Sequence, residues 1–144
     1  MEEDMYSAYS FMLEKTSRRV KQYAKKVFRE ENFGITVDQW SVLKNLHNKN
    51  GVSQSELAEM TFKGMPTLTH ILDLLHQKGL IEKLVDSNDR RKVKIRLTEE
   101  GFKKVEKLKP SIQKIRQKAW ENLSKKDFEH FSETLKRIHK NLDT

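Results

Sequence analysis

Five cationic side chains lie within seven residues of the segment SNDRRKVKIRLT, residues 87–98. Arg90 and Arg91 are adjacent, and Lys92, Lys94 and Arg96 follow at every second position. Because successive side chains of a β-strand point to opposite faces, residues 92–97 are predicted to form a strand with one cationic and one apolar face. Guanidinium and ammonium groups gathered in this way can bind phosphate oxygens, so the segment is a candidate polyanion-binding site.

The arginine pair is flanked by two carboxylates, Asp86 and Asp89. A carboxylate two residues before Arg91 can hold its guanidinium in one orientation by a charge-assisted hydrogen bond, which reduces the entropy lost when a ligand binds. The alternative is that the outer face of the strand is charged only for solubility, as the edges of sheets often are.

Catalytic patterns are not found in the sequence. It contains no cysteine, and its five histidines are scattered, without an HExxH motif, a nucleophile turn or a glycine-rich phosphate loop. His130 and Glu133 lie one helical turn apart and could share a metal ion, although pairing on the surface is the commoner explanation. We therefore expect no enzyme activity, no cofactor and no metal site, with a metal-sensing regulator kept as an alternative.

The composition fits one soluble domain of 144 residues. Charged residues make up 35% of the chain and hydrophobic residues another 35%, and the net charge is +8. No apolar run is long enough to span a membrane and the N-terminus begins acidic, so we expect a cytoplasmic protein. The positive balance favours a polyanionic partner.

Two helices are predicted in the first third of the chain. Apolar residues recur every three or four positions from about residue 4 to 31, and Asn32, Phe33 and Gly34 end this pattern. A second helix follows to about Asn48. Thr36 and Gln39 have the spacing of a capping box at its start, and Ile35 and Trp40 have the spacing of a hydrophobic staple.

Two shorter helices and a hairpin follow. Ser53 and Glu56 fit a second capping box. The next helix, about residues 65–78, has Pro66 in its first turn and Gly79 at its end. Its apolar stripe is Leu68, Ile71, Leu72 and Leu75. The period then changes to two, which predicts a hairpin with strands 80–85 and 92–97 around a loop at 86–91.

Two amphipathic helices close the chain. Thr98 is a candidate cap for the first, whose stripe begins at Phe102 and in which Pro110 is expected to cause a kink or a break. Ser124 and Asp127 fit a capping box for the second. Aromatic and aliphatic residues on the first and last helices need a further surface to cover them, and a two-fold copy is the usual one: Tyr6, Tyr9, Phe11, Phe128, Phe131 and Leu135.

This order of elements is that of a winged helix-turn-helix within a mainly α (α+β) fold. Such a unit presents the outer side of its third helix, residues 65–78, to the major groove of DNA. Rotation by ~100° per residue from Leu68 places Pro66, His70, Asp73 and Gln77 on that side, with Thr67 and Thr69 on its flanks. Hydroxyls can bind phosphates or base edges, and an imidazole or a carboxylate can pair with guanine or cytosine. The hairpin loop, with Arg90 and Arg91, can reach the adjacent minor groove.

The chain resembles the MarR family of bacterial transcription regulators. The resemblance rests on ITVDQWSVL, VSQSELAEM, LLHQKGLIEK and above all DSNDRRKVKIRLTEEG. It implies a homodimer that binds pseudo-palindromic double-stranded DNA, usually as a repressor, and is often released by a small aromatic or phenolic effector. It also implies that Arg91 enters the minor groove, that Asp89 positions it, and that Ser53, Thr67, Thr69 and His70 contact DNA. Relatives often carry arginine or lysine in the recognition helix, where this chain has His70 and Leu74.

The resulting hypothesis is a single MarR-type domain over residues 1–144. Its winged helix-turn-helix lobe covers residues 36–98, and residues 1–34 and 99–144 form a helical dimerisation lobe. The predicted DNA-binding set is Ser53, Pro66, Thr67, Thr69, His70, Asp73, Asp89, Arg90, Arg91, Lys92 and Lys94, with residues 86–92 as the wing. Weak candidates for an effector pocket are Tyr23, Trp40, His47 and Phe62. A winged-helix module for protein or RNA contact remains an alternative.

Overall fold

The computed structural model describes residues 4–143, which form six helices and a three-stranded antiparallel sheet. In chain order the elements are α1 (Tyr9–Glu30), α2 (Val37–Asn48), β1 (Val52–Ser53), α3 (Gln54–Thr61), α4 (Met65–Gln77), β2 (Ile81–Val85), β3 (Val93–Leu97), α5 (Glu99–Ala119) and α6 (Lys125–Asn141). The predicted winged helix-turn-helix fold is confirmed.

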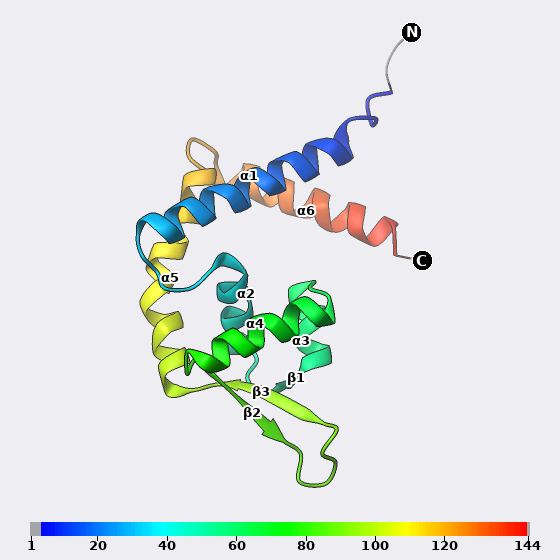
Figure 1. Cartoon of the computed structure of the whole chain (residues 1–144). Coiled ribbons are helices and arrows are strands. Elements are labelled where there is room, and N and C mark those ends of the chain that lie inside the picture. Colours follow the sequence, from blue (N-terminus) through cyan, green and yellow to red (C-terminus); the bar gives the residue numbers. More distant parts are fainter. Residues whose placement is uncertain (1–3, 144) are drawn as a thin grey trace.

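The helices α2, α3 and α4 and the sheet form a compact unit, named here the winged helix unit (Figure 1). The β2–β3 hairpin projects from it, away from α1 and α6. The strand order is β1-β3-β2, and Lys83 pairs with Ile95 in the hairpin register. The first helix, α1, and the last, α6, lie on the opposite side, and α5 runs between that side and the sheet.

Side-chain caps set the starts of four helices. Thr36 and Gln39 form the predicted capping box of α2, and Ser124 and Asp127 form that of α6. Ser53 and Thr98 accept hydrogen bonds from the third residue of α3 and α5. The predicted capping box of α3 is only half formed, because its acidic residue pairs with Lys49 instead.

The core lies inside the winged helix unit and against α5. Leu43, Leu57, Leu68, Leu72 and Ile95 are completely buried. Burial of such side chains stabilises the fold by roughly 1.5–3 kcal/mol each. The apolar face of β3 is therefore the predicted one, with its cationic face exposed.

Three predictions about the helices need correction. The first helix begins at Tyr9 rather than near residue 4, after a turn over residues 5–8. Of the kink or break expected at Pro110, the break does not occur: α5 continues through the proline, and Leu108 and Ile112 pack into the core on both sides of it. Phe102 is exposed, and its ring stacks on His47 instead of entering the core.

The first turn of α5 lies directly against the start of β2. A side chain at Gly101 would place its Cβ 2.0 Å from the carbonyl oxygen of Leu80, so this position has room for glycine alone. Thr98 strengthens the junction, since its backbone N–H donates to Leu80 O at 3.1 Å and its hydroxyl to Gly79 O at 2.6 Å. The base of the hairpin and the start of α5 are thus in backbone contact.

Candidate nucleic-acid interface

The helix α4 presents a polar face to solvent. Its apolar stripe packs into the core, as predicted, and this leaves the opposite side exposed. Gly64 precedes the helix in an extended conformation, and Pro66 lies in the first turn, where its missing N–H costs no helical hydrogen bond. The exposed residues include the five of the predicted DNA-binding set on this helix, Pro66, Thr67, Thr69, His70 and Asp73, and also Gln77.

Two residues of this face are held by neighbours that sequence reasoning missed. Gln54 Nε2 donates to Thr69 Oγ1 at 2.7 Å, so the start of α3 is connected to α4. Lys83 Nζ of β2 lies 3.0 Å from Asp73 Oδ1. The Asp73 carboxylate, expected as a free acceptor for a base, therefore already has a cationic partner. No local pattern signals either contact, because each joins residues more than nine positions apart.

The wing, residues 86–92, contains an arginine that is hydrogen-bonded within its own loop. Asp89 accepts three hydrogen bonds from Arg91: from its backbone N–H at 3.0 Å, from Nε at 3.1 Å and from Nη2 at 3.2 Å. The Arg91 side chain is 91% exposed. The side-chain and backbone hydrogen bonds from Arg91 hold the pKa of Asp89 below its usual value. The predicted orienting contact is therefore present at the tip of an exposed loop.

The other wing cations differ in their surroundings. Arg90, Lys92 and Lys94 are exposed. Arg96, which continues the same row, lies opposite Glu82 in the hairpin register and forms an ion pair with it. The row available for phosphate contact therefore ends at Lys94, and the neutralised Arg96 lies nearer the base of the hairpin.

Ser53 links the start of α3 to this row. It is the N-cap of α3, where its hydroxyl accepts from the Glu56 backbone N–H at 3.1 Å. In β1 it lies opposite Lys94 in the sheet register. The two-residue strand β1 was not predicted, because two residues are too short to show a period. It brings Ser53 to the side of the hairpin that carries the exposed lysines.

A cavity of about 470 Å³ lies between α1, α2 and α5. Two of the four candidate pocket residues, Tyr23 and Trp40, line it. Trp40 is 5% exposed, and its indole Nε1 has no hydrogen-bond partner among residues 4–143. A buried donor of this kind can be satisfied by a ligand acceptor. The lining also includes Arg19 and Arg116, which are cationic.

The other two candidates lie elsewhere. His47 Nε2 lies 2.7 Å from Glu106 Oε1 and connects α2 to α5. The hydrogen bonds from His47 and Lys109 lower the pKa of Glu106. Phe62 is 94% exposed in the turn before α4, in a left-handed conformation with φ 54°. Neither side chain lines the cavity, so the structure does not group His47 and Phe62 with Tyr23 and Trp40.

Comparison with known proteins agrees with this architecture. The sequence model of the MarR family matches residues 35–93, from the start of α2 to the start of β3. This segment belongs to the MarR family. The matched segment contains α4, the complete wing and every residue of the predicted DNA-binding set except Lys94.

Solved structures extend the similarity of this chain beyond the matched segment to nearly its full length. MepR of Staphylococcus aureus, in a crystal structure of its complex with DNA, is 29% identical, with 93% of this chain and 98% of that chain covered and a TM-score of 0.82. The Bordetella bronchiseptica protein BpsR has the same fold at 20% identity, with 96% and 98% covered and a TM-score of 0.84. MepR is described as a transcription regulator of a multidrug efflux pump.

Among residues 4–143, no helix has the length and hydropathy that crossing a membrane requires. Within the same range, no three histidine or acidic side chains lie close enough together to hold a metal ion.

Proposed function

We propose that the chain is a homodimeric transcription regulator that binds double-stranded DNA at a pseudo-palindromic operator. The helix α4 enters the major groove and the wing, residues 86–92, enters the adjacent minor groove. The observation that carries the proposal is the exposed Arg91 guanidinium, held at the wing tip by Asp89. An oriented arginine suits a narrow minor groove, whose negative potential attracts it.

The conformation of the chain supports the same function. Its TM-score is 0.82 against MepR in complex with DNA and 0.66 against MepR in another crystal structure. Because the relative is the same protein in both cases, the difference reflects the arrangement of its parts rather than its sequence. The arrangement found in this chain is the one closer to DNA-bound MepR.

Selection from a random duplex library, followed by gel shift, tests DNA binding. We expect a preferred sequence with two half-sites about one helical turn (~34 Å) apart. Replacing Arg91 by alanine should weaken binding to that sequence roughly 5- to 100-fold. Arg18→Ala is the matched control, since it removes the same charge from an exposed position on α1.

Failure to select any duplex would refute the proposal and favour a module for protein or RNA contact. Unchanged binding by Arg91→Ala would refute the assignment of the wing. We further propose that the regulator represses: purified protein should lower transcription in vitro from a promoter that overlaps the selected sequence, and higher transcription would indicate an activator.

The dimer proposal rests on an uncovered apolar surface. A groove of about 570 Å³ lies between α1 and α6, lined by Tyr9, Met12, Val20, Phe131 and Leu135 among others. None of the seventeen residues of α6, all within the described range, is buried in the single chain. Large exposed apolar surfaces mark protein contact sites, and a second copy is the commonest partner.

We propose that the cavity lined by Tyr23 and Trp40 takes a small aromatic or phenolic effector that releases DNA. The unpartnered Trp40 Nε1 is the observation that favours it. A Trp120→Phe variant retains Trp40 as its single tryptophan, so its fluorescence can be titrated with a panel of hydroxybenzoates. Saturable quenching together with loss of the gel shift is expected, and binding without release would exclude the regulatory role.

A further inference from the structure

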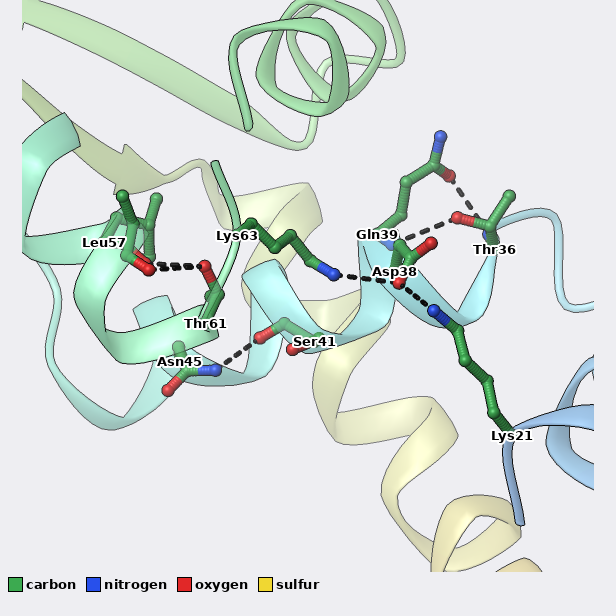
Figure 2. A network of polar contacts seen from close by, with 10 residues as sticks. Lys21, Thr36, Asp38, Gln39, Ser41, Asn45, Leu57, Thr61 and Lys63 are labelled. Carbon is green, nitrogen blue, oxygen red and sulfur yellow. Dashed lines mark hydrogen bonds and ion pairs between the residues drawn. The ribbon is translucent and has the colours of Figure 1, made fainter. Parts of the chain in front are cut away.

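Both ends of α4 are connected to the first turn of α2, residues 36–39. Before the helix begins, Lys63 Nζ donates to Asp38 Oδ1 at 2.8 Å. At the other end, Lys78 Nζ donates to Gln39 Oε1 at 3.0 Å. Figure 2 shows Lys63 reaching across to Asp38, which stands beside Gln39 on α2. Two neighbouring residues of one turn thus hold the two ends of the helix proposed to read DNA.

Asp38 also connects this turn to α1. Lys21 Nζ donates to the same carboxylate oxygen, Oδ1, at 2.9 Å, from the side opposite Lys63 (Figure 2). The Lys63 side chain is only 14% exposed, so its attraction to Asp38 is less screened by water than that of a surface pair. Burial acts to raise the pKa of Asp38, but the hydrogen bonds from Lys63 and Lys21 outweigh it and leave the pKa below its usual value.

The second connection is rigid because Gln39 is itself fixed. The residue is 4% exposed, and its Oε1 also accepts from the Thr36 backbone N–H at 3.1 Å within the capping box. Lys78 donates in addition to Gly34 O at 2.9 Å, in the loop between α1 and α2. A rotation of α4 about its centre would break both the Lys63 and the Lys78 contacts.

We propose that Asp38 and Gln39 are positioning residues for DNA binding, which set the orientation of α4 through Lys63 and Lys78. The inference rests on the proposed function, since it concerns how α4 meets the duplex. In the competing explanation the same contacts only add to the stability of the fold. The two explanations differ in what they predict for the discrimination between operator and unrelated DNA.

Asp38→Asn distinguishes the two explanations, because its change of charge and a misorientation of α4 act on DNA binding in opposite directions. The variant loses a negative charge, so its general attraction to DNA phosphates should be unchanged or slightly stronger. Misorientation of α4 should instead weaken base contacts, which carry sequence discrimination. We expect the ratio of affinities for the selected operator and for an unrelated duplex of equal length to fall about tenfold, as for loss of a hydrogen bond to a charged group.

Glu14→Gln is the matched control, because it removes one negative charge from an exposed ion pair on α1. Its affinity ratio should equal that of the wild type. Asp38→Glu keeps the charge and should restore part of the lost ratio. In a double-mutant cycle, Asp38→Asn combined with Lys63→Met should lower the ratio no further than Lys63→Met alone.

Circular dichroism melting accompanies each measurement. If Asp38→Asn does not fold, Lys78→Gln tests the contact to Gln39 at the other end of α4. The affinity ratio remains the readout. A ratio within about threefold of wild type in a folded variant would overturn the inference. Failure of the proposed function is distinguishable, because the wild-type protein would then select no duplex at all.

Discussion

The helices α4 and α6 both have an apolar stripe, but only the stripe of α4 is covered within the chain. In α4, Leu68, Leu72 and Leu75 are completely buried. In α6, no residue of the described helix is buried, and Phe128 and Phe131 remain 51% and 46% exposed. The sheet, α2 and α3 enclose the first stripe, whereas the second borders an open groove beside α1.

The difference shows what an amphipathic pattern specifies. Its period determines that a helix has an apolar face, but the surface that covers this face depends on the rest of the fold. For α4 that surface lies within the same chain. For α6 the proposed dimer supplies it from another copy, so the stability of this part should depend on protein concentration.

The largest effect is expected in the buried stripe. Leu72→Ala should lower the free energy of unfolding by about 2–5 kcal/mol, because it leaves a cavity in a closed core. Leu135→Ala, the same substitution at a half-buried position of α6, is the matched comparison. Urea unfolding at several protein concentrations checks both. The loss of unfolding free energy caused by Leu72→Ala should not depend on protein concentration, whereas the loss caused by Leu135→Ala should. The same concentration dependence for both variants would contradict the comparison.

A smaller effect on folding, but a direct one on assembly, is expected from Phe131→Asp. A charge placed in the groove between α1 and α6 should weaken the dimer on the order of 100-fold, because the carboxylate would lose its water. Sedimentation velocity over a dilution series measures this shift. Lys136→Gln, at an exposed position of α6, lowers the net charge by the same one unit and controls for the change of charge. If Phe131→Asp sediments as the wild type does, α6 is not the dimer surface.

The smallest effect concerns the start of α6 and its pH dependence. The backbone and side-chain hydrogen bonds with Ser124 hold the pKa of Asp127 below the usual value of an aspartate. Because the folded state favours the carboxylate, its contribution to stability is present above that value and disappears as pH falls through the lower folded pKa. Asp127→Asn should therefore be less stable than wild type at pH 6, and urea unfolding should show the gap closing towards pH 3. A gap independent of pH would exclude the charge as its cause.

Local features of the fold were predictable from the sequence. The caps at Thr36, Ser53, Thr98 and Ser124 depend on residues within three positions, and all four are present. The Asp89 contact to Arg91 is equally local. Such interactions need no knowledge of tertiary structure, because the chain brings the partners together by itself.

Contacts between distant segments were not predictable. The pairing of Arg96 with Glu82 depends on the hairpin register, and the residue types in the loop do not determine that register. The pairing of Lys83 with Asp73 depends on how β2 lies against α4. For the cavity, the aromatic residues were visible in the sequence, but the packing of α1, α2 and α5 decided which of them face it.

The close approach at Gly101 has a consequence for how the hairpin can adapt. With the carbonyl of Leu80, directly before β2, in the space where a side chain would stand, the base of the hairpin cannot move closer to α5 without a backbone clash. Adjustment of the wing to the width of a groove is therefore expected in the distal part of the hairpin, where β2 is exposed from Lys83 onward. A displacement of the start of α5 would therefore move the base of the hairpin with it, because the two are in backbone contact.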